Sequence, residues 1–140
     1  YAVGGWTDGY TNAIFRMMQH LQCPRRALVG PWTHLYPHLG EPGNPIGFLQ
    51  EALRWWDRWL KCSQNGIDKE PMIVTWMQEN FRAHPSLPIV EGQWLESVSW
   101  PMDRQPVKDL FISKNSMAET KGSAENHKIS TPMRCGLGGG

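Results

Sequence analysis

Two short apolar runs near the start of the chain constrain the fold most strongly. Residues 1–6 (YAVGGW) and 27–30 (ALVG) are too short for helices and are typical of buried strands. Between them, Thr11 or Asn12 is predicted to cap a helix that stops before Pro24. Its apolar residues recur at helical spacing: Ile14, Phe15, Met18 and Leu21. The order strand, helix, strand predicts an α/β domain with parallel strands.

A second helix is the strongest secondary-structure prediction in the sequence. Residues 46–61 (IGFLQEALRWWDRWLK) show a broad apolar face opposite a polar one. Trp55, Trp56 and Trp59 lie on the apolar face, so we expect them to pack in the core rather than to stack on a carbohydrate. Gly66, in the following SQNG stretch, is expected to end the helix in a left-handed conformation.

The second half of the chain is predicted to contain short strands and long connections. Residues 72–77 (MIVTWM) and 109–113 (DLFIS) have the β-branched and apolar composition of strands. Residues 79–101 are rich in proline and are expected to be turn-like, and residues 114–131 are polar and are expected to form a loop.

Composition restricts the partners of the chain. The 140 residues carry 14 basic and 13 acidic side chains, a net charge of +1, so no electrostatic argument points to nucleic acid or an anionic membrane. No apolar run approaches the roughly 20 residues of a spanning helix. We therefore expect a small-molecule or short-peptide partner, with neither nucleic acid nor membrane.

Other features bear on completeness and on cysteine chemistry. The sequence starts at Tyr1 without an initiator methionine and ends on CGLGGG, which we interpret as a fragment whose localisation signals are not known. Cys23, Cys62 and Cys135 are odd in number and lack CxxC spacing, so free or buried thiols are expected rather than a disulfide framework.

One acidic and one basic side chain stand where parallel strands place functional groups. Asp8 follows the first predicted strand and His34, within GPWTH, follows the second. A right-handed crossover puts both loops at the same end of the sheet. The carboxylate can then accept a hydrogen bond from Nδ1–H of the imidazole, which leaves Nε2 free as a base. The ordinary alternatives are a turn-forming aspartate and a capping or core histidine.

This pair is two-thirds of a Ser-His-Asp triad. In α/β-hydrolases the serine comes first, followed by the aspartate and then the histidine. Asp8 precedes His34 here, and no G-x-S-x-G motif occurs in the sequence. If the triad interpretation holds, the serine lies in a segment that precedes Tyr1.

Four motifs occur in an order that resembles a known family. They are GGWTDGY, LVGPWTH, LRWWDRWLK followed by NGI, and SWP. In this respect the chain resembles the CocE/NonD hydrolases, which include cocaine esterase, X-Pro dipeptidyl-peptidase, α-amino acid ester hydrolase and glutaryl acylase-like enzymes. The resemblance implies that Asp8 matches the triad aspartate and His34 the triad histidine.

The resemblance also implies a domain organisation. Residues 1–103 would be the C-terminal portion of an α/β-hydrolase domain, and residues 104–140 the incomplete beginning of a β-sandwich of jelly-roll type. Two departures stand out: Lys61-Cys62 replaces the Lys-Gly of the family, and residues 77–100 are longer and richer in proline than in cocaine esterase. The substrate class is therefore not transferred.

The function predicted from the sequence is that of a serine hydrolase acting on an ester, an amide or a short peptide, with no cofactor and no metal. Esters, β-lactams, acylated amines and X-Pro peptides all remain open as substrates. A zinc site formed by His34 and His38 is disfavoured, because Pro37 disrupts the helical spacing and no third ligand follows. Trp6 and Trp32 either wall the site or pack beneath it. The alternative function is a tryptophan-rich, non-catalytic module that binds a carbohydrate or a protein partner.

Overall fold

The computed structural model describes residues 1–41, 43–82, 87–102, 106–113, 116–124, 126, 128 and 130. The chain divides into two compact units, residues 1–103 and 104–138, which are treated separately. The elements of the first unit, in chain order, are β1 (Ala2–Gly5), α1 (Thr11–His20), β2 (Ala27–Gly30), α2 (Phe48–Leu60), a 3₁₀ turn (Ile67–Lys69), β3 (Ile73–Gln78) and β4 (Gly92–Ser97).

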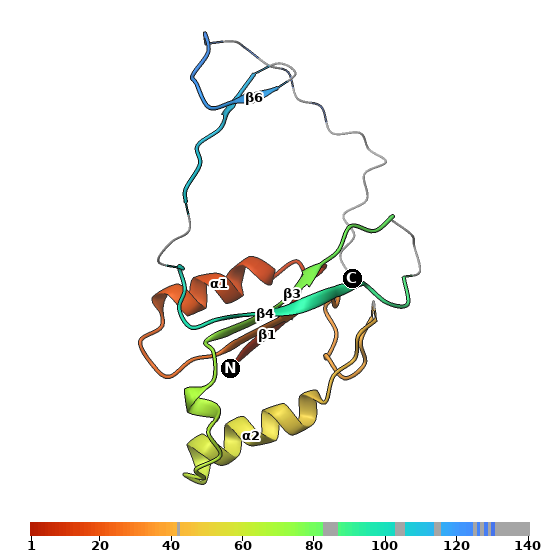
Figure 1. The fold of residues 1–140 in the computed structure, drawn as a ribbon, viewed down its shortest axis with the longest axis vertical. Helices are drawn as coiled ribbons and strands as arrows, with labels where there is room; N and C mark the ends of the chain where they lie inside the picture. The colour runs from red at the N-terminus through yellow and green to blue at the C-terminus, as the bar shows by residue number, and fades with distance from the viewer. Residues whose placement is uncertain are drawn as a thin grey trace. The chain divides into compact units, whose positions relative to one another are not determined.

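The first unit is a mixed four-stranded sheet with two helices. The strand order is β1-β2-β3-β4, with β1, β2 and β3 parallel and β4 antiparallel to β3. Figure 1 shows α1 against one face of the sheet and α2 against the other. The predicted parallel strands are confirmed, since Gly5 and Gly30 end β1 and β2 in register at the same edge of the sheet.

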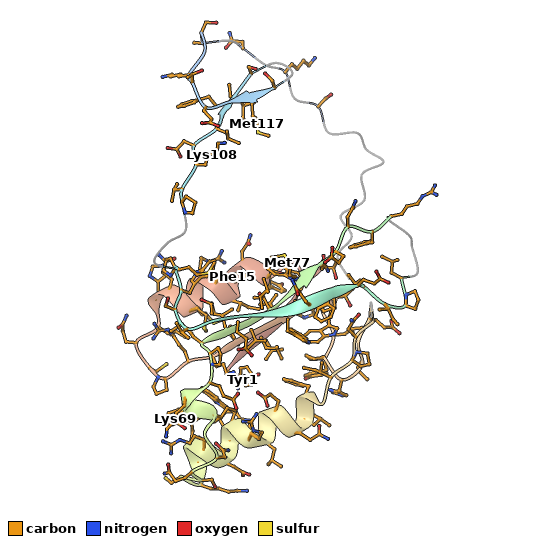
Figure 2. The ribbon with its side chains drawn as sticks, viewed as in Figure 1. Tyr1, Phe15, Lys69, Met77, Lys108 and Met117 are labelled. Carbon is orange, nitrogen blue, oxygen red and sulfur yellow. The ribbon has the colours of Figure 1, made fainter. Side chains whose placement is uncertain are left out.

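The core lies between α1 and the sheet. Its buried members are Ile14, Met18, Ala27, Val29 and Ile73. Phe15, on α1, packs against this cluster and is labelled in Figure 2. Leu21 does not join the apolar face as predicted, because α1 ends at His20 and Leu21 turns into extended backbone with 41% of its surface exposed.

The beginning of α1 differs from the prediction. Tyr10 is the N-cap residue, and no side chain caps the helix. Thr11 is already helical, and its hydroxyl donates hydrogen bonds to the carbonyl oxygens of Gly5 and Asp8. Thr11 therefore ties the helix to the end of β1 instead of capping the first helical turn.

Strand β4 lies within the segment that was expected to be turn-like. Its residues pair with β3 from Ile73↔Ser97 to Gln78↔Gly92, and Trp76 meets Trp94 edge-on at 5.0 Å between ring centroids. Four consecutive residues of β4 are exposed, so neither face of this strand is covered: Gln93, Trp94, Leu95 and Glu96. Without a buried face, the alternating pattern that indicates a strand is missing from the sequence.

Helix α2 buries less of its apolar face than expected. Trp55 is buried as predicted, at 8% exposure, but Trp56 is 54% exposed, which contradicts the expected core position. Trp59 is 36% exposed, which also departs from the expected core position, and the Arg58 guanidinium lies 5.1 Å from its ring centroid. Three leucines on the same helix are also exposed: Leu49, Leu53 and Leu60. The apolar face is thus wider than the surface against which it packs.

The end of α2 also corrects a prediction. The left-handed residue that follows the helix is Cys62, with φ = 58°, and not Gly66. Gly66 is left-handed as well (φ = 81°), but it precedes the 3₁₀ turn that starts at Ile67. A residue with a Cβ atom carries steric strain in this conformation. The Lys-Cys departure from the family motif therefore falls at a strained backbone position.

Replacing Cys62 with glycine is expected to raise the free energy of unfolding by about 1 kcal/mol, because glycine adopts the left-handed conformation without strain. Urea denaturation checks this. The Cys62→Ala variant is the matched control: it removes the thiol but keeps the Cβ atom, so it should bring no such gain. Equal stabilisation by both variants would show that the thiol, not the backbone, is responsible.

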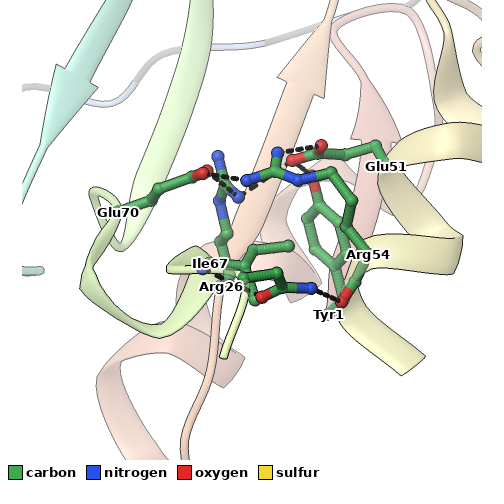
Figure 3. Close-up of polar contacts among 7 residues, drawn as sticks. Tyr1, Arg26, Glu51, Arg54, Ile67 and Glu70 are labelled. Carbon is green, nitrogen blue, oxygen red and sulfur yellow. Dashed lines mark hydrogen bonds and ion pairs between the residues drawn. The ribbon is translucent and has the colours of Figure 1, made fainter. Parts of the chain in front are cut away.

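Four charged side chains join α2 to the sheet (Figure 3). Arg26, which is 8% exposed, precedes β2 and forms ion pairs with Glu51 of α2, at 2.9 Å, and with Glu70. Arg54 pairs with the same two carboxylates, at 2.7 Å to Glu51. Two arginines and two glutamates thus alternate, and each carboxylate is shared.

The cluster makes stability depend on pH. Partial burial raises the pKa of Glu70, but its bonds to Arg54 and Arg26 outweigh burial and hold this pKa below the ordinary value of 4.5. The folded state therefore binds fewer protons at Glu70 than the unfolded state. The stabilisation is complete above about pH 4.5 and is lost as the pH falls through the lowered pKa.

We expect Glu70→Gln to cost about 1–2 kcal/mol at pH 7 and progressively less toward pH 3. Urea denaturation at both pH values measures the difference. Glu91, which is exposed and forms no ion pair with the described residues, provides the control Glu91→Gln, with little change at either pH. A Glu70→Gln penalty that is the same at pH 3 and pH 7 would contradict the assignment.

The second unit contains a small hairpin. Strands β5 (Phe111–Ile112) and β6 (Met117–Ala118) pair antiparallel. Strand β6 lies within the predicted 114–131 loop, which is therefore interrupted; two residues are too few to give a sequence signal. The assignment of this region to a jelly-roll domain stays a prediction.

Two remaining sequence predictions concern the thiols and the membrane. Cys23 and Cys62 are free and exposed, and Cys135 lies outside the described residues. Neither helix of the described part of the chain is both long and apolar enough to cross a membrane.

Candidate active site

The loop that follows β1 holds Asp8 in a tight turn. Its backbone N–H donates to the carbonyl of Gly5 at 3.1 Å, and its carboxylate Oδ1 accepts the N–H of Tyr10 at 2.8 Å. Asp8 is therefore a turn former, as the ordinary interpretation proposes. This role uses only one carboxylate oxygen, so Oδ2 remains available.

In the loop that follows β2, hydrogen bonds of the neighbouring residues fix the position of His34. The N–H and the hydroxyl of Thr33 both donate to the carbonyl of Glu41, at 2.8 and 2.9 Å. Trp32 is completely buried, and its indole N–H donates to the carbonyl of Asn44 at 3.1 Å. The two residues that precede His34 are thus fixed to the segment that leads into α2.

The two loops are bonded directly to each other. Thr7 donates two hydrogen bonds to the carbonyl oxygen of Trp32, from its N–H at 3.3 Å and from its hydroxyl at 2.8 Å. The same carbonyl lies so close to Gly5 that a Cβ atom there would be 1.7 Å from it. Close approach of the backbones at the strand ends brings the two candidate side chains together.

Asp8 and His34 are in hydrogen-bond contact. Oδ2 of Asp8 lies 3.0 Å from Nδ1 of His34, while the aspartate side chain is 10% exposed and the imidazole 64% exposed. Burial raises the pKa of Asp8. The Tyr10 N–H and the His34 ring lower this pKa by more than burial raises it, so the net pKa is below its ordinary value. The carboxylate is ionised at neutral pH and selects the tautomer that carries its proton on Nδ1.

This tautomer leaves Nε2 of His34 as a hydrogen-bond acceptor. No residue in the described part of the chain forms a hydrogen bond to it. A solvent-accessible imidazole that is oriented by a buried carboxylate can take a proton from a nucleophile and return it to a leaving group.

A cavity of about 390 Å³ lies beside the pair. Its described lining residues are Val3, Gly4, Asp8, His34, Leu35, Tyr36, Pro37 and Phe48. The sequence alone does not predict that the apolar members of this set line a site. Leu35, Tyr36 and Pro37 directly follow His34, so their position in the sequence could have indicated that they line the cavity. Phe48 comes from α2, and nothing in the sequence indicates that it lies at this cavity.

The structure answers the question about the two flanking tryptophans. Trp32 packs beneath the site, and Trp6 donates its indole N–H to the carbonyl of Trp76 at 2.6 Å and stacks on Phe15. Neither is among the described residues that line the cavity. Both support the loops rather than contact a ligand.

Three other histidines follow His34 in the sequence: His38, His84 and His127. His38 stacks against Tyr36 and Phe48, while His84 and His127 lie outside the described residues. Within the described ranges, no three acidic, cysteine or histidine side chains are grouped to hold a metal ion.

The comparisons with known proteins add no family. No family model matches the chain, and no curated protein shows significant similarity to it. Only the sequence motifs and the geometry of Asp8 and His34 therefore bear on the function of the chain.

Proposed function

We propose that the chain supplies the aspartate and the histidine of a serine hydrolase that transfers an acyl group from an ester, an amide or a short peptide to water. The observation that carries this proposal is the 3.0 Å contact between Asp8 Oδ2 and His34 Nδ1 at the carboxyl ends of two adjacent parallel strands. The motifs around both residues resemble those of the CocE/NonD hydrolases, which supports the same roles.

In the proposed mechanism, a serine in a segment preceding Tyr1 attacks the substrate carbonyl. Nε2 of His34 accepts the serine proton and then gives it to the departing alcohol or amine, which leaves an acyl-serine. Water attacks the acyl-serine by the same route: its proton passes to His34, the acid departs, and the serine regains the proton. Throughout, Asp8 orients the imidazole and stabilises its cationic form.

The fold agrees with this proposal at a coarse level. The mixed sheet with helices on both faces has the parallel β1–α1–β2 unit that a hydrolase domain requires for its last two triad members. We propose that the first unit is the C-terminal part of an α/β-hydrolase domain and that the second begins a jelly-roll domain.

The alternative, a tryptophan-rich binding module, is supported less well. Trp32 and Trp55 are buried and do not present their rings to a ligand. A binding module also gives no functional reason for the contact between Asp8 and His34. The two functions differ in one requirement: only the hydrolase needs a nucleophile elbow in the same polypeptide.

The direct experiment compares two proteins with a p-nitrophenyl ester as substrate. The polypeptide that contains this chain together with its preceding segment is expected to hydrolyse the ester, whereas the 140-residue chain alone is expected to be inactive because it has no nucleophile elbow. Turnover by the chain alone, or inactivity of the longer polypeptide, would contradict the proposal.

A further inference from the structure

The carboxylate of Asp8 fixes one corner of the His34 ring but not the tilt of the ring. The contact joins Oδ2 to Nδ1, and the imidazole side chain is 64% exposed. The last torsion of a histidine side chain is broad, so a single bond at Nδ1 lets the ring plane turn. The lone pair of Nε2 lies in this plane, and proton transfer requires it to face its partner. A defined direction at Nε2 therefore needs a second contact to the ring.

The ring of Tyr10 makes such a contact. Its centroid lies 5.5 Å from the centroid of the His34 ring, and the two ring planes are inclined at 57°. Tilted pairs with centroids about 4.5–7 Å apart are a favoured arrangement of two aromatic rings. Asp8 and Tyr10 thus contact the imidazole at different places, one at Nδ1 and the other at the ring itself.

The backbone of Tyr10 is fixed on both sides of its side chain. Its N–H donates to Oδ1 of Asp8 at 2.8 Å, and its carbonyl accepts the N–H of Ala13, in the first turn of α1, at 2.9 Å. Tyr10 is the N-cap residue of α1, but its side chain forms no capping hydrogen bond. The ring is therefore presented to His34 from a backbone that Asp8 and the helix hold in place.

We propose that Tyr10 is a positioning residue whose ring sets the tilt of the His34 imidazole and thereby the direction of Nε2. One residue then serves both members of the pair, Asp8 through its main chain and His34 through its ring. The positioning rests on these contacts, and its effect on turnover rests on the hydrolase proposed above. The alternative is that the Tyr10 ring contacts the substrate directly, and kinetics distinguishes the two.

The order of the His34 ring tests the proposal without turnover. NMR relaxation of the ring carbons in the isotopically labelled chain gives their order parameter. In Tyr10→Ala we expect it to fall from a value typical of rigid groups, about 0.85, toward one typical of flexible groups, about 0.6 or less. Tyr10→Phe keeps the ring and removes only the hydroxyl, so it should retain the original value.

Tyr36→Ala is the matched control for this measurement. Tyr36 is also an exposed tyrosine, at 66%, and it follows His34 by two residues. Its ring pairs with those of His38 and Phe48. This substitution should therefore leave the order parameter of the His34 ring unchanged.

Two further measurements separate ring tilt from other effects of Tyr10→Ala. The main-chain bond to Asp8 is retained in this variant, so the proton of the neutral imidazole should stay on Nδ1, whereas Asp8→Asn is expected to shift it. The midpoint of urea denaturation should not change, because Tyr10 is 71% exposed. A loss of ring order without a change in tautomer or stability is the signature of lost positioning.

The kinetic test uses the longer polypeptide and a p-nitrophenyl ester. Tyr10→Ala is expected to lower kcat roughly 2- to 10-fold, because the productive orientation of His34 becomes rarer, and to leave KM within about twofold. Tyr10→Phe should restore kcat. A raised KM with unchanged kcat would show that Tyr10 contacts the substrate, and it would overturn the proposal.

The outcomes separate this proposal from the proposed function. If Tyr10→Ala left the ring order unchanged, or if Tyr36→Ala lowered it equally, Tyr10 would not position His34, while the contact between Asp8 and His34 and the hydrolase would stand. Inactivity of the longer polypeptide would remove the hydrolase, but the order of the His34 ring would still decide whether Tyr10 orients it.

Discussion

Replacing Asp8 with asparagine is expected to lower ester turnover by the longer polypeptide about 10⁴-fold, the loss typical of a triad aspartate. Asparagine is uncharged and does not stabilise the imidazolium. It also fails to select the tautomer with the proton on Nδ1, so Nε2 no longer serves as the base. In the turn, Oδ1 of Asp8 accepts one backbone N–H, that of Tyr10, and the Oδ1 of asparagine can accept the same bond. The turn itself should therefore persist.

The measurement is kcat/KM for a p-nitrophenyl ester, accompanied by circular dichroism to show that the fold is retained. Asp57→Asn provides a carboxylate-to-amide control on α2, where Asp57 pairs with Lys61, and should leave turnover within about twofold of that of the unsubstituted polypeptide. His34→Ala should abolish turnover as well. If Asp8→Asn retained the original rate, the carboxylate would be a turn former only.

The Gly5→Ala substitution is expected to cost about 3 kcal/mol or more in the free energy of unfolding and to separate the two loops that carry Asp8 and His34. The added Cβ atom would lie 1.7 Å from the carbonyl oxygen of Trp32 and 2.4 Å from its carbon. These are backbone atoms, so no side-chain rotation relieves the clash. The loop must move, and Thr7 would lose its hydrogen bonds to the same carbonyl.

Thermal denaturation measures the loss of stability, and turnover of the longer polypeptide measures the separation of the loops. Gly9→Ala is the matched control in the same turn, because no atom lies within 4 Å of the Cβ position there. Its stability should change little. Equal effects of the two substitutions would show that the turn responds to any alanine and that close approach at Gly5 is not essential.

The sequence predicted those features that depend on local pattern. The β1–α1–β2 unit follows from apolar runs and helical spacing, and the meeting of Asp8 with His34 follows from the rule that parallel strands end at one edge. The rule does not say how closely the two loops approach each other. In the structure they are held together because the carbonyl of Trp32 lies against Gly5 and accepts a hydrogen bond from Thr7.

The features that the sequence missed depend on tertiary contacts. Strand β4 has no alternating pattern because the side chains of residues 93–96 are exposed on both faces, and Trp94 is held by Trp76 across the strand pair. The exposure of Trp56 depends on how much surface α2 finds to cover, which periodicity does not state. Phe48 joins the cavity from a helix that is distant in the sequence. Cys62 adopts the left-handed conformation at the position where the family that the chain resembles has glycine.

The protonation of the His34 ring tests the central claim most directly. The account holds that Asp8 fixes the neutral imidazole with its proton on Nδ1 and with Nε2 free. Nitrogen-15 NMR of the labelled chain above the imidazole pKa is expected to show a protonated Nδ1 and an unprotonated Nε2, and a shift of this tautomer in Asp8→Asn. A proton on Nε2 in the unmodified chain, or a spectrum that Asp8→Asn leaves unchanged, would contradict the account.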